Sequence, residues 1–237
     1  MKKYYLISFL LLTICMDAHS ISDRIQLPDG SFYQGEIENN LFNGKGKQIF
    51  PDGSYYEGDF KDGLYNGTGK YVNSIFSYSG DFVNGRMTGK CKYQYFDGSS
   101  YEGDIKDGIF NGKGKQLLSN GNTYIGDFLN GKPDGNGFYV LANGDTYTGH
   151  FSNGDFNGKG VYSFANGQKY IGNFSNGFFE GEGTFIYANG KTKKGIYKNG
   201  YLIGKKKVEI NLSTALLIFI FILSNCFWLI KIKKMKK

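Results

Sequence analysis

The chain has 237 residues, a formal net charge of +7, 36 glycines, 3 prolines and 17% aromatic residues. Residues 21–190 carry 14 basic and 19 acidic side chains, a net charge of −5. That balance excludes nucleic acid as a partner, because nucleic acid requires a basic face.

The first segment, residues 1–20, has the pattern of a secretory signal peptide. Two lysines precede an apolar run at residues 4–15, and the small residues Ala18 and Ser20 follow it. A basic start, a short apolar run and small residues at this spacing predict cleavage after Ser20. A core helix or a short membrane anchor is the alternative, although a run of about 12 residues is too short to span a bilayer comfortably.

Residues 21–204 form a repeat array with a period of 23 residues, shortened to 22 in the second repeat. A fixed short period indicates one supersecondary unit stacked many times, so that each unit contacts mainly its neighbours. Each repeat begins with tyrosine and has glycine two positions later. The repeat-defining residues are Tyr33, Gly35, Tyr56, Gly58, Tyr78, Gly80, Tyr101, Gly103, Tyr124, Gly126, Tyr147, Gly149, Tyr170 and Gly172.

The order of residues within one repeat predicts a β-hairpin. With the tyrosine as position zero, a large apolar residue stands at +4 and an Asn-Gly or Asp-Gly pair at +6 and +7. Positions 0, +2 and +4 share one face of a strand, where the glycine admits close approach of a ring or backbone. Asn-Gly and Asp-Gly are strong hairpin signals.

A Gly-x-Gly pair at +11 and +13, a second strand and another Asn-Gly or Asp-Gly turn complete most units. The sequence therefore predicts an all-β repeat array. We expect an elongated, twisted antiparallel β-meander of 23-residue hairpins with about 15 short strands, followed by one C-terminal transmembrane α-helix.

The pattern Y-x-G-x-[FI]-x-[ND]-G-x-x-x-G-x-G resembles the MORN repeat, and residues 101–114 are a close match. Seven repeats begin at Tyr33, a decayed eighth begins at Lys193, and residues 24–32 resemble the second strand of an incomplete unit. The resemblance implies a scaffold or membrane-associating module. Junctophilins are similar in architecture, with MORN repeats and a C-terminal membrane anchor that bridge two membranes, but they lack a cleaved signal.

Three repeats depart from the pattern. The second lacks one residue near Asn73 and Ser74, which predicts a bulge or local irregularity there. In the third, Cys91 replaces the +13 glycine and is the only cysteine of the array, so no disulfide forms within it. Lys193 and Lys206 replace the tyrosine and the +13 glycine of the eighth repeat, as expected of a terminal unit that caps an edge.

A basic juxtamembrane segment at 205–209, an uncharged stretch at 210–230 and a basic tail at 231–237 end the chain. The uncharged stretch is long enough to cross a bilayer as one helix. A buried soluble helix is a poor alternative, because a repeat sheet offers no pocket for an all-round apolar helix. Together with a cleaved signal this predicts a single-pass type I membrane protein with lumenal or extracellular repeats. A tail-anchored protein with cytosolic repeats is the alternative.

Lysines gather at the membrane-proximal end of the array. The candidate contacts for anionic phospholipid headgroups are Lys191, Lys193, Lys194, Lys198, Lys205, Lys206 and Lys207. An ordinary solvated capping end explains these lysines equally well.

The sequence offers no set of residues for catalysis, for a cofactor or for a metal. His150 stands at +3, where Asp or Asn is usual, and is interpreted as a solvent-facing substitution. Asp59, Asp81, Asp104 and Asp127 form a column at +3, which repetition explains better than a cation site does. No glycine-rich segment continues into the Gly-Lys-Ser/Thr of a phosphate loop. We therefore expect a protein that is not an enzyme.

Two functions remain. The first is a non-enzymatic, membrane-anchored scaffold whose aromatic-lined sheet binds a protein partner or a second copy, because exposed aromatic surface marks interaction sites. The alternative is a phospholipid-binding tether that docks a second membrane through its array.

Overall fold

A computed structural model of the chain describes residues 24–205. The predicted signal peptide at 1–20, membrane span at 210–230 and tail at 231–237 lie outside the described residues. So does the basic segment at 205–209 apart from Lys205. Within residues 24–205, no helix has the length and apolar character needed to cross a membrane.

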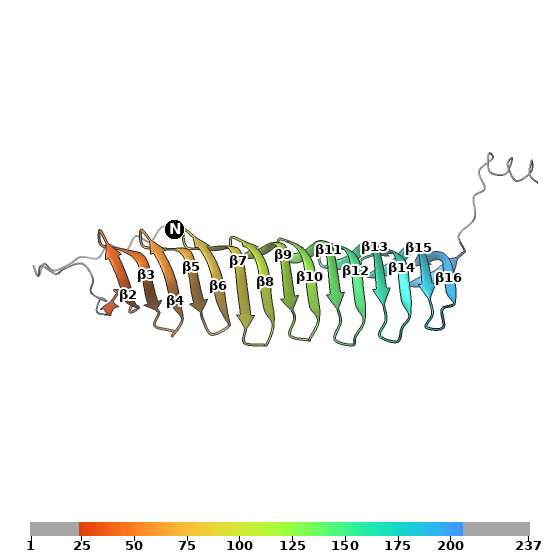
Figure 1. Ribbon diagram of the computed structural model, residues 1–237, viewed down its shortest axis with the longest axis horizontal. Coiled ribbons are helices and arrows are strands. Elements are labelled where there is room, and N and C mark those ends of the chain that lie inside the picture. Colours follow the sequence, from red (N-terminus) through yellow and green to blue (C-terminus); the bar gives the residue numbers. More distant parts are fainter. Residues whose placement is uncertain (1–23, 206–237) are drawn as a thin grey trace, which may run out of the picture.

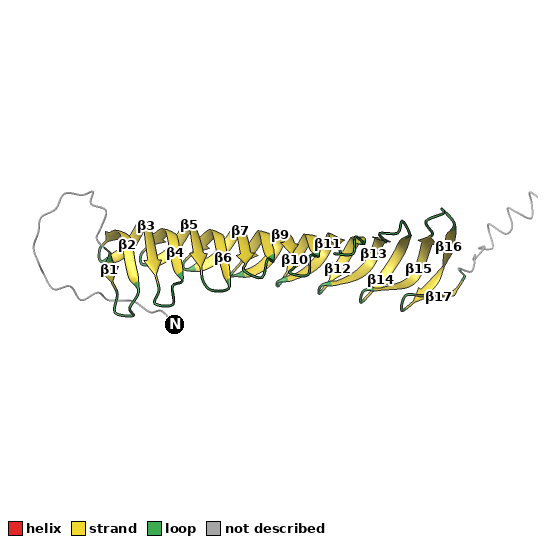
Figure 2. Cartoon of the chain, turned by 90° about the horizontal axis from the view of Figure 1, so that it is seen from below, coloured by secondary structure: helices red, strands yellow, loops and turns green. Residues whose placement is uncertain are grey.

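The described chain is one 17-stranded antiparallel sheet in which each strand pairs with the strands before and after it in sequence (Figure 1). Figure 2 shows only strands and loops between its two ends. The strands are β1 (Ile25–Gln26), β2 (Phe32–Glu38), β3 (Leu41–Ile49), β4 (Tyr55–Lys61), β5 (Leu64–Val72), β6 (Phe76–Val83), β7 (Arg86–Tyr95), β8 (Ser100–Lys106), β9 (Ile109–Leu117), β10 (Thr123–Leu129), β11 (Lys132–Val140), β12 (Thr146–Ser152), β13 (Asp155–Ser163), β14 (Lys169–Ser175), β15 (Phe178–Ile186), β16 (Thr192–Lys198) and β17 (Tyr201–Gly204).

The predicted meander is confirmed for this part of the chain. The expected number of about 15 strands is too low, because the incomplete units at the two ends add the short strands β1 and β17. These end strands pair on one side only.

The two turns of a repeat differ in geometry. At the hairpin tip both central residues have positive φ, as in Asn130 (50°) and Gly131 (83°), which is the type I′ geometry that Asn-Gly favours. At the other turn only the glycine is left-handed, as in Gly144 (87°), whose N–H donates to the carbonyl of Leu141 at 2.9 Å.

The local irregularity predicted near Asn73 and Ser74 is present, and it is a tighter turn and not a bulge. The side-chain oxygen of Asn73 accepts the N–H groups of Ile75 and Phe76 at 2.8 and 2.9 Å, which closes a tighter turn. The missing residue is absorbed in this turn, so β5 and β6 pair without a register shift.

Bulges occur instead inside each of the seven hairpins, between positions +2 and +4 or directly after +2. The first lies between Gly35 and Ile37, and the same register shift recurs up to Gly172 and Asn173. A bulge bends its strand and adds twist. The bend brings the hydroxyl of each repeat tyrosine onto the carbonyl three residues later, as in Tyr33 to Glu36 at 2.8 Å.

The repeat tyrosines and the +4 residues from Phe60 to Phe174 form the core, whereas the first +4 residue, Ile37, is exposed. Tyr33 is 0% exposed because three features enclose it: the bend of its own strand, the ring of Phe42 stacked at 3.8 Å and the ring of Phe60 edge-on at 5.2 Å. The stacked ring of Phe42 belongs to the same repeat as Tyr33, whereas the edge-on ring of Phe60 belongs to the next. The edge-on contact therefore joins neighbouring repeats.

This packing overturns the expectation that the sheet presents an aromatic-lined binding face. All seven repeat tyrosines are at most 1% exposed, and the +4 residues from Phe60 to Phe174 are at most 4% exposed. The rings contribute to stability and leave little area for a partner.

The glycines at +2 and +13 lie opposite each other under the tyrosine ring. A Cβ added to Gly126 would lie 2.6 Å from the Cα of Gly137 and from the carbonyl oxygen of Asn136. The predicted close approach of ring and backbone is therefore confirmed, and glycine stands on both strands in six of the seven repeats, Cys91 being the exception opposite Gly80.

Candidate functional site

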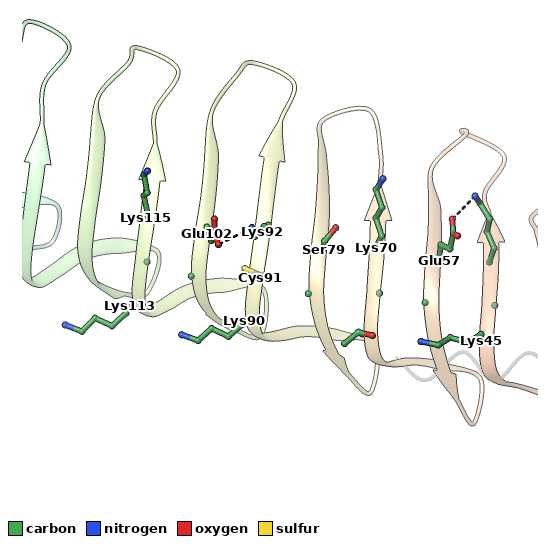
Figure 3. A pocket seen from close by; sticks show the side chains of 18 of the residues that line it. Lys45, Glu57, Lys70, Ser79, Lys90, Cys91, Lys92, Glu102, Lys113 and Lys115 are labelled. Carbon is green, nitrogen blue, oxygen red and sulfur yellow. Dashed lines mark hydrogen bonds and ion pairs between the residues drawn. The ribbon is translucent and has the colours of Figure 1, made fainter.

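A groove of about 1600 Å³ runs across the strands from β2 to β10. The backbone of the +2 and +13 glycines forms its floor. The side chains that form its walls stand at odd-numbered distances from the tyrosine along each strand, or opposite such positions on the neighbouring strand. They therefore point away from the tyrosine core, and the groove lies on the opposite face of the sheet. One wall consists of residues at +1 and +14, and the other of residues at +12 together with Glu36 at +3 (Figure 3).

The first wall, which we call the central row, is a continuous line of cross-strand neighbours. Lys47 pairs with Glu57 across β3 and β4, with Nζ to Oε2 at 2.8 Å, and Lys92 pairs with Glu102 at 3.2 Å. Figure 3 shows Lys70 between Glu57 and the Lys92–Glu102 pair, and Lys115 beyond that pair.

Lys70 and Lys115 differ from the two paired lysines. Their neighbours on the following strand are Ser79 and Ile125, neither of which carries a charge. Both lysines are exposed, and among residues 24–205 neither forms an ion pair. On the preceding strands Lys70 and Lys115 lie beside Glu57 and Glu102, which are already ion-paired with Lys47 and Lys92. Four lysines and two glutamates therefore give the row a net excess of two positive charges.

The acidic column at +3 lies along the second wall, and the contacts of its carboxylates explain why aspartate recurs there. The Asp104 carboxylate accepts the main-chain N–H of Lys113 at 2.9 Å and forms an ion pair with Lys90 of the preceding repeat at 2.5 Å. Lys90 first, and then this N–H, hold the pKa of Asp104 below its usual range. Asp59 and Asp127 have the same two kinds of partner.

These aspartates thus satisfy backbone groups that the bulge leaves unpaired and bind adjacent repeats together. In the described part of the chain, no group of three or more His, Cys, Asp or Glu side chains is placed to hold a metal ion. His150 occupies the same column and is exposed, as predicted.

The central row changes character after Lys115. It continues through pairs of cross-strand neighbours on β10 to β15, and its members there are Ile125, Phe138, Thr148, Val161, Ile171 and Thr184. Ile125 and Ile171 are each 45% exposed and Phe138 is 38% exposed. The row is therefore charged over its first half and apolar over its second.

Cys91 takes the place of a +13 glycine and is 5% exposed. Burial raises the pKa of its thiol to about 12. Its repeat also has Met87 where most repeats have an aromatic ring at +9, so Tyr78 packs edge-on against Tyr93 at 5.0 Å and has no stacked partner.

A second exposed surface follows the hairpin tips, at positions +5 and +8. Several tips join one exposed aliphatic residue to one exposed cation, as Lys61 with Leu64 and Lys106 with Ile109 do. Leu129 with Lys132 repeats this arrangement. This surface was not among the sequence predictions, although the residue types at +5 and +8 recur from repeat to repeat.

The predicted lipid-contact lysines are exposed as far as the structure describes them, but they do not share one face. Lys193 and Lys194 are neighbours on β16, so their side chains point to opposite faces of the sheet. Lys191 lies in the turn before β16, and Lys198 lies at the opposite end of that strand. Lys205 ends the described chain, and Lys206 and Lys207 lie outside it.

Comparison with known families identifies the repeats. The family model described as MORN repeat matches residues 33–55, 56–74, 78–100, 101–123, 124–146, 147–169 and 170–192. These segments make up about two thirds of the chain. No curated protein matches the sequence.

Comparison with solved structures gives matches of low identity and low TM-score. The SAS-4 (dCPAP) TCP domain of Drosophila melanogaster, in complex with a proline-rich motif of Ana2, is 13% identical with a TM-score of 0.41, over 79% of this chain and 97% of that one. The G-box domain of the microcephaly protein CPAP is 11% identical with a TM-score of 0.41, over 74% and 99%. The TCP10 domain of Danio rerio CPAP is 13% identical with a TM-score of 0.32, over 78% and 100%.

Proposed function

The chain belongs to the MORN-repeat family, and from that premise we propose that it is a non-enzymatic scaffold, anchored in a membrane, whose repeat array binds a protein partner. The observation that carries the proposal is the open groove on the face opposite the core. Two rows of exposed charged side chains wall it, and it extends over nine strands. Long concave surfaces of this kind are what repeat proteins use to bind partners.

The anchor in this proposal is the uncharged stretch at residues 210–230, and the array lies in the lumen or outside the cell because a signal peptide at 1–20 precedes it. Protease protection of intact membranes tests the topology. With one epitope tag before Ile25 and one after Lys237, protease should digest only the second tag in sealed vesicles. Digestion of the first tag, with residues 1–20 retained in the mature chain, would instead show a tail-anchored protein with cytosolic repeats.

The hairpin tips support a second candidate function, a tether that docks a second membrane. An exposed aliphatic side chain beside a cation, as at Leu64 and Lys61, suits the boundary between headgroups and acyl chains of an anionic bilayer. Against it stands the net charge of −5 over residues 21–190.

Vesicle flotation separates the two functions. The soluble array, residues 21–204, forms its own core and can be mixed with vesicles that contain anionic phospholipid. The scaffold function predicts that the array stays at the bottom of the gradient. Flotation that is lost in the variant Leu64→Asp/Ile109→Asp would establish the tether instead.

A further inference from the structure

We propose that the central row is a bipartite site for one segment of a partner protein, a segment that is acidic at one end and apolar at the other. Its acidic end lies over β5 to β9 and its apolar end over β10 to β14. The inference rests on the proposed scaffold function and names its binding site and the chemistry of its partner.

The positive charges of the row are the reason to expect an acidic end in the partner segment. Glu57 and Glu102 are the only acidic neighbours of Lys70 and Lys115, and both glutamates form their ion pairs with Lys47 and Lys92. Four lysines against two glutamates leave the row with a net charge of +2 between β3 and β9. Lys70 and Lys115 lie four strands apart, on β5 and β9, a separation of roughly 19 Å at about 4.8 Å per strand. The array as a whole is acidic, so this local excess of positive charge runs against its composition.

The apolar side chains in the second half of the row are the reason to expect an apolar end in the partner segment. Ile125, Phe138 and Ile171 point away from the tyrosine core, so core packing does not explain their apolar character. With Val161 they form a strip that also crosses four strand steps, roughly 19 Å from β10 to β14. Nothing within residues 24–205 covers this strip, as the exposure of its side chains shows.

The whole site is long. From Lys70 on β5 to Ile171 on β14 it crosses nine strand steps, or roughly 43 Å. A polypeptide spans that length with about 13 extended residues or about 29 helical ones. The backbone of the inner strands is already paired on both sides, so the partner segment contacts side chains and does not join the sheet as a strand.

Charge complementarity decides which segment fits. The apolar segments of this chain that lie outside the sheet, at residues 4–15 and 210–230, are flanked by lysines, which carry the same sign as Lys70 and Lys115. A flat anionic membrane would contact the hairpin tips before it contacted a groove floored with glycine. An acidic and apolar segment of another protein satisfies both halves of the row.

The test uses the full chain in detergent micelles and fluorescent 30-residue peptides. Two probes join a Glu- and Ser-rich half to a Leu- and Phe-containing half, in the two possible orders. Each probe has a control peptide, its twin, that carries Lys in place of every Glu. Fluorescence anisotropy should show at least one acidic probe binding about tenfold or more tightly than its twin, and the affinity should fall as salt rises. Micelles without protein give the background.

Variants locate the site. Lys70→Glu/Lys115→Glu should weaken binding about tenfold, and Ile125→Ser/Ile171→Ser should weaken it comparably. The matched control is Lys61→Glu/Lys106→Glu, which makes the same charge change in the same two repeats but at the hairpin tips. Circular dichroism checks that all variants keep the sheet.

The proposal is overturned if neither acidic probe binds more tightly than its twin, or if the tip variant weakens binding as much as the row variant does. Binding of the probes with loss only in the tip variant would leave the scaffold function standing and remove the site from the central row. No selective binding, together with flotation of the array on anionic vesicles, would refute the scaffold function itself.

Discussion

The hydroxyl of Tyr101 donates a 2.6 Å hydrogen bond to the main-chain carbonyl oxygen of Asp104, three residues further along the same chain segment. That bond exists because a bulge bends β8 between Gly103 and Ile105. The carboxylate of Asp104 at the same time caps the N–H of Lys113. Asp104 therefore accepts the hydrogen bond of the core tyrosine with its main-chain carbonyl and stabilises the bulge with its side chain.

Removing this hydroxyl should destabilise the array. Tyr101→Phe keeps the ring but leaves the Asp104 carbonyl without its buried donor, at a cost of about 1 kcal/mol in the free energy of unfolding. Tyr201→Phe, at a tyrosine that is 77% exposed, is the control and should change stability by less than about 0.5 kcal/mol. Urea denaturation of the array measures both. Equal effects would contradict the role assigned to the hydroxyl.

A side chain at a +2 glycine should be costly. Gly126→Val places atoms where the Cα of Gly137 and the carbonyl of Asn136 already lie within 2.6 Å of the new Cβ. We expect a loss of about 1–3 kcal/mol, with Gly126→Ala causing a smaller loss. The neighbouring change Asp127→Asn keeps an acceptor for the Asn136 N–H and gives up only a surface ion pair, so it should cost about 0.5 kcal/mol. Thermal unfolding ranks the three variants.

Acid should weaken the bulges. The folded-state pKa values of Asp59, Asp104 and Asp127 lie below those of the unfolded chain, chiefly because of Lys45, Lys90 and Lys113. The unfolded chain therefore takes up protons first, so the stability contributed by these groups is complete above about pH 4 and is lost as pH falls below it.

The comparison of Asp104→Asn with the unmodified array checks this. The variant should lose less stability than the unmodified array between pH 7 and pH 3, since it has no carboxyl to protonate at this position. Parallel pH profiles for the two proteins would show that the ion pair and the N–H contact contribute nothing to acid sensitivity.

Alkali should unfold the array cooperatively. Burial raises the pKa of Tyr33, Tyr147 and Tyr170 to about 12, and it raises the pKa of the other repeat tyrosines as well. Free tyrosine ionises near 10, so the unfolded chain loses its phenolic protons first as pH rises. The stability contributed is complete below about pH 10, falls by about 1.4 kcal/mol per pH unit for each such tyrosine as pH rises further, and is lost near the folded-state pKa of about 12.

Absorbance at 295 nm and circular dichroism, recorded on one alkaline titration, test that expectation. Ionisation of the core tyrosines should coincide with loss of the sheet. If all tyrosines ionised near pH 10 while the sheet persisted, the packing described here for the rings would be wrong.

Local patterns in the sequence were sufficient to predict the repeat unit. The alternation of Tyr, Gly and an apolar residue set one face of each strand, and Asn-Gly set the turns, since both are decided within a few residues. For the short second repeat the sequence predicted a bulge or a local irregularity without deciding between them. The form observed, a tighter turn capped by the side chain of Asn73, depends on where the next strand pairs.

The chain by itself thus determined the period, the strands, the turn types and the need for glycine beneath each tyrosine. Only the tertiary structure decided that the rings are buried and that a charged and apolar row crosses the opposite face. Lys115 and Ile125, or Phe138 and Thr148, become neighbours through the pairing register of separate strands. The bend that encloses the rings comes from a bulge, which exists only between two paired strands, so no single stretch of sequence specifies it.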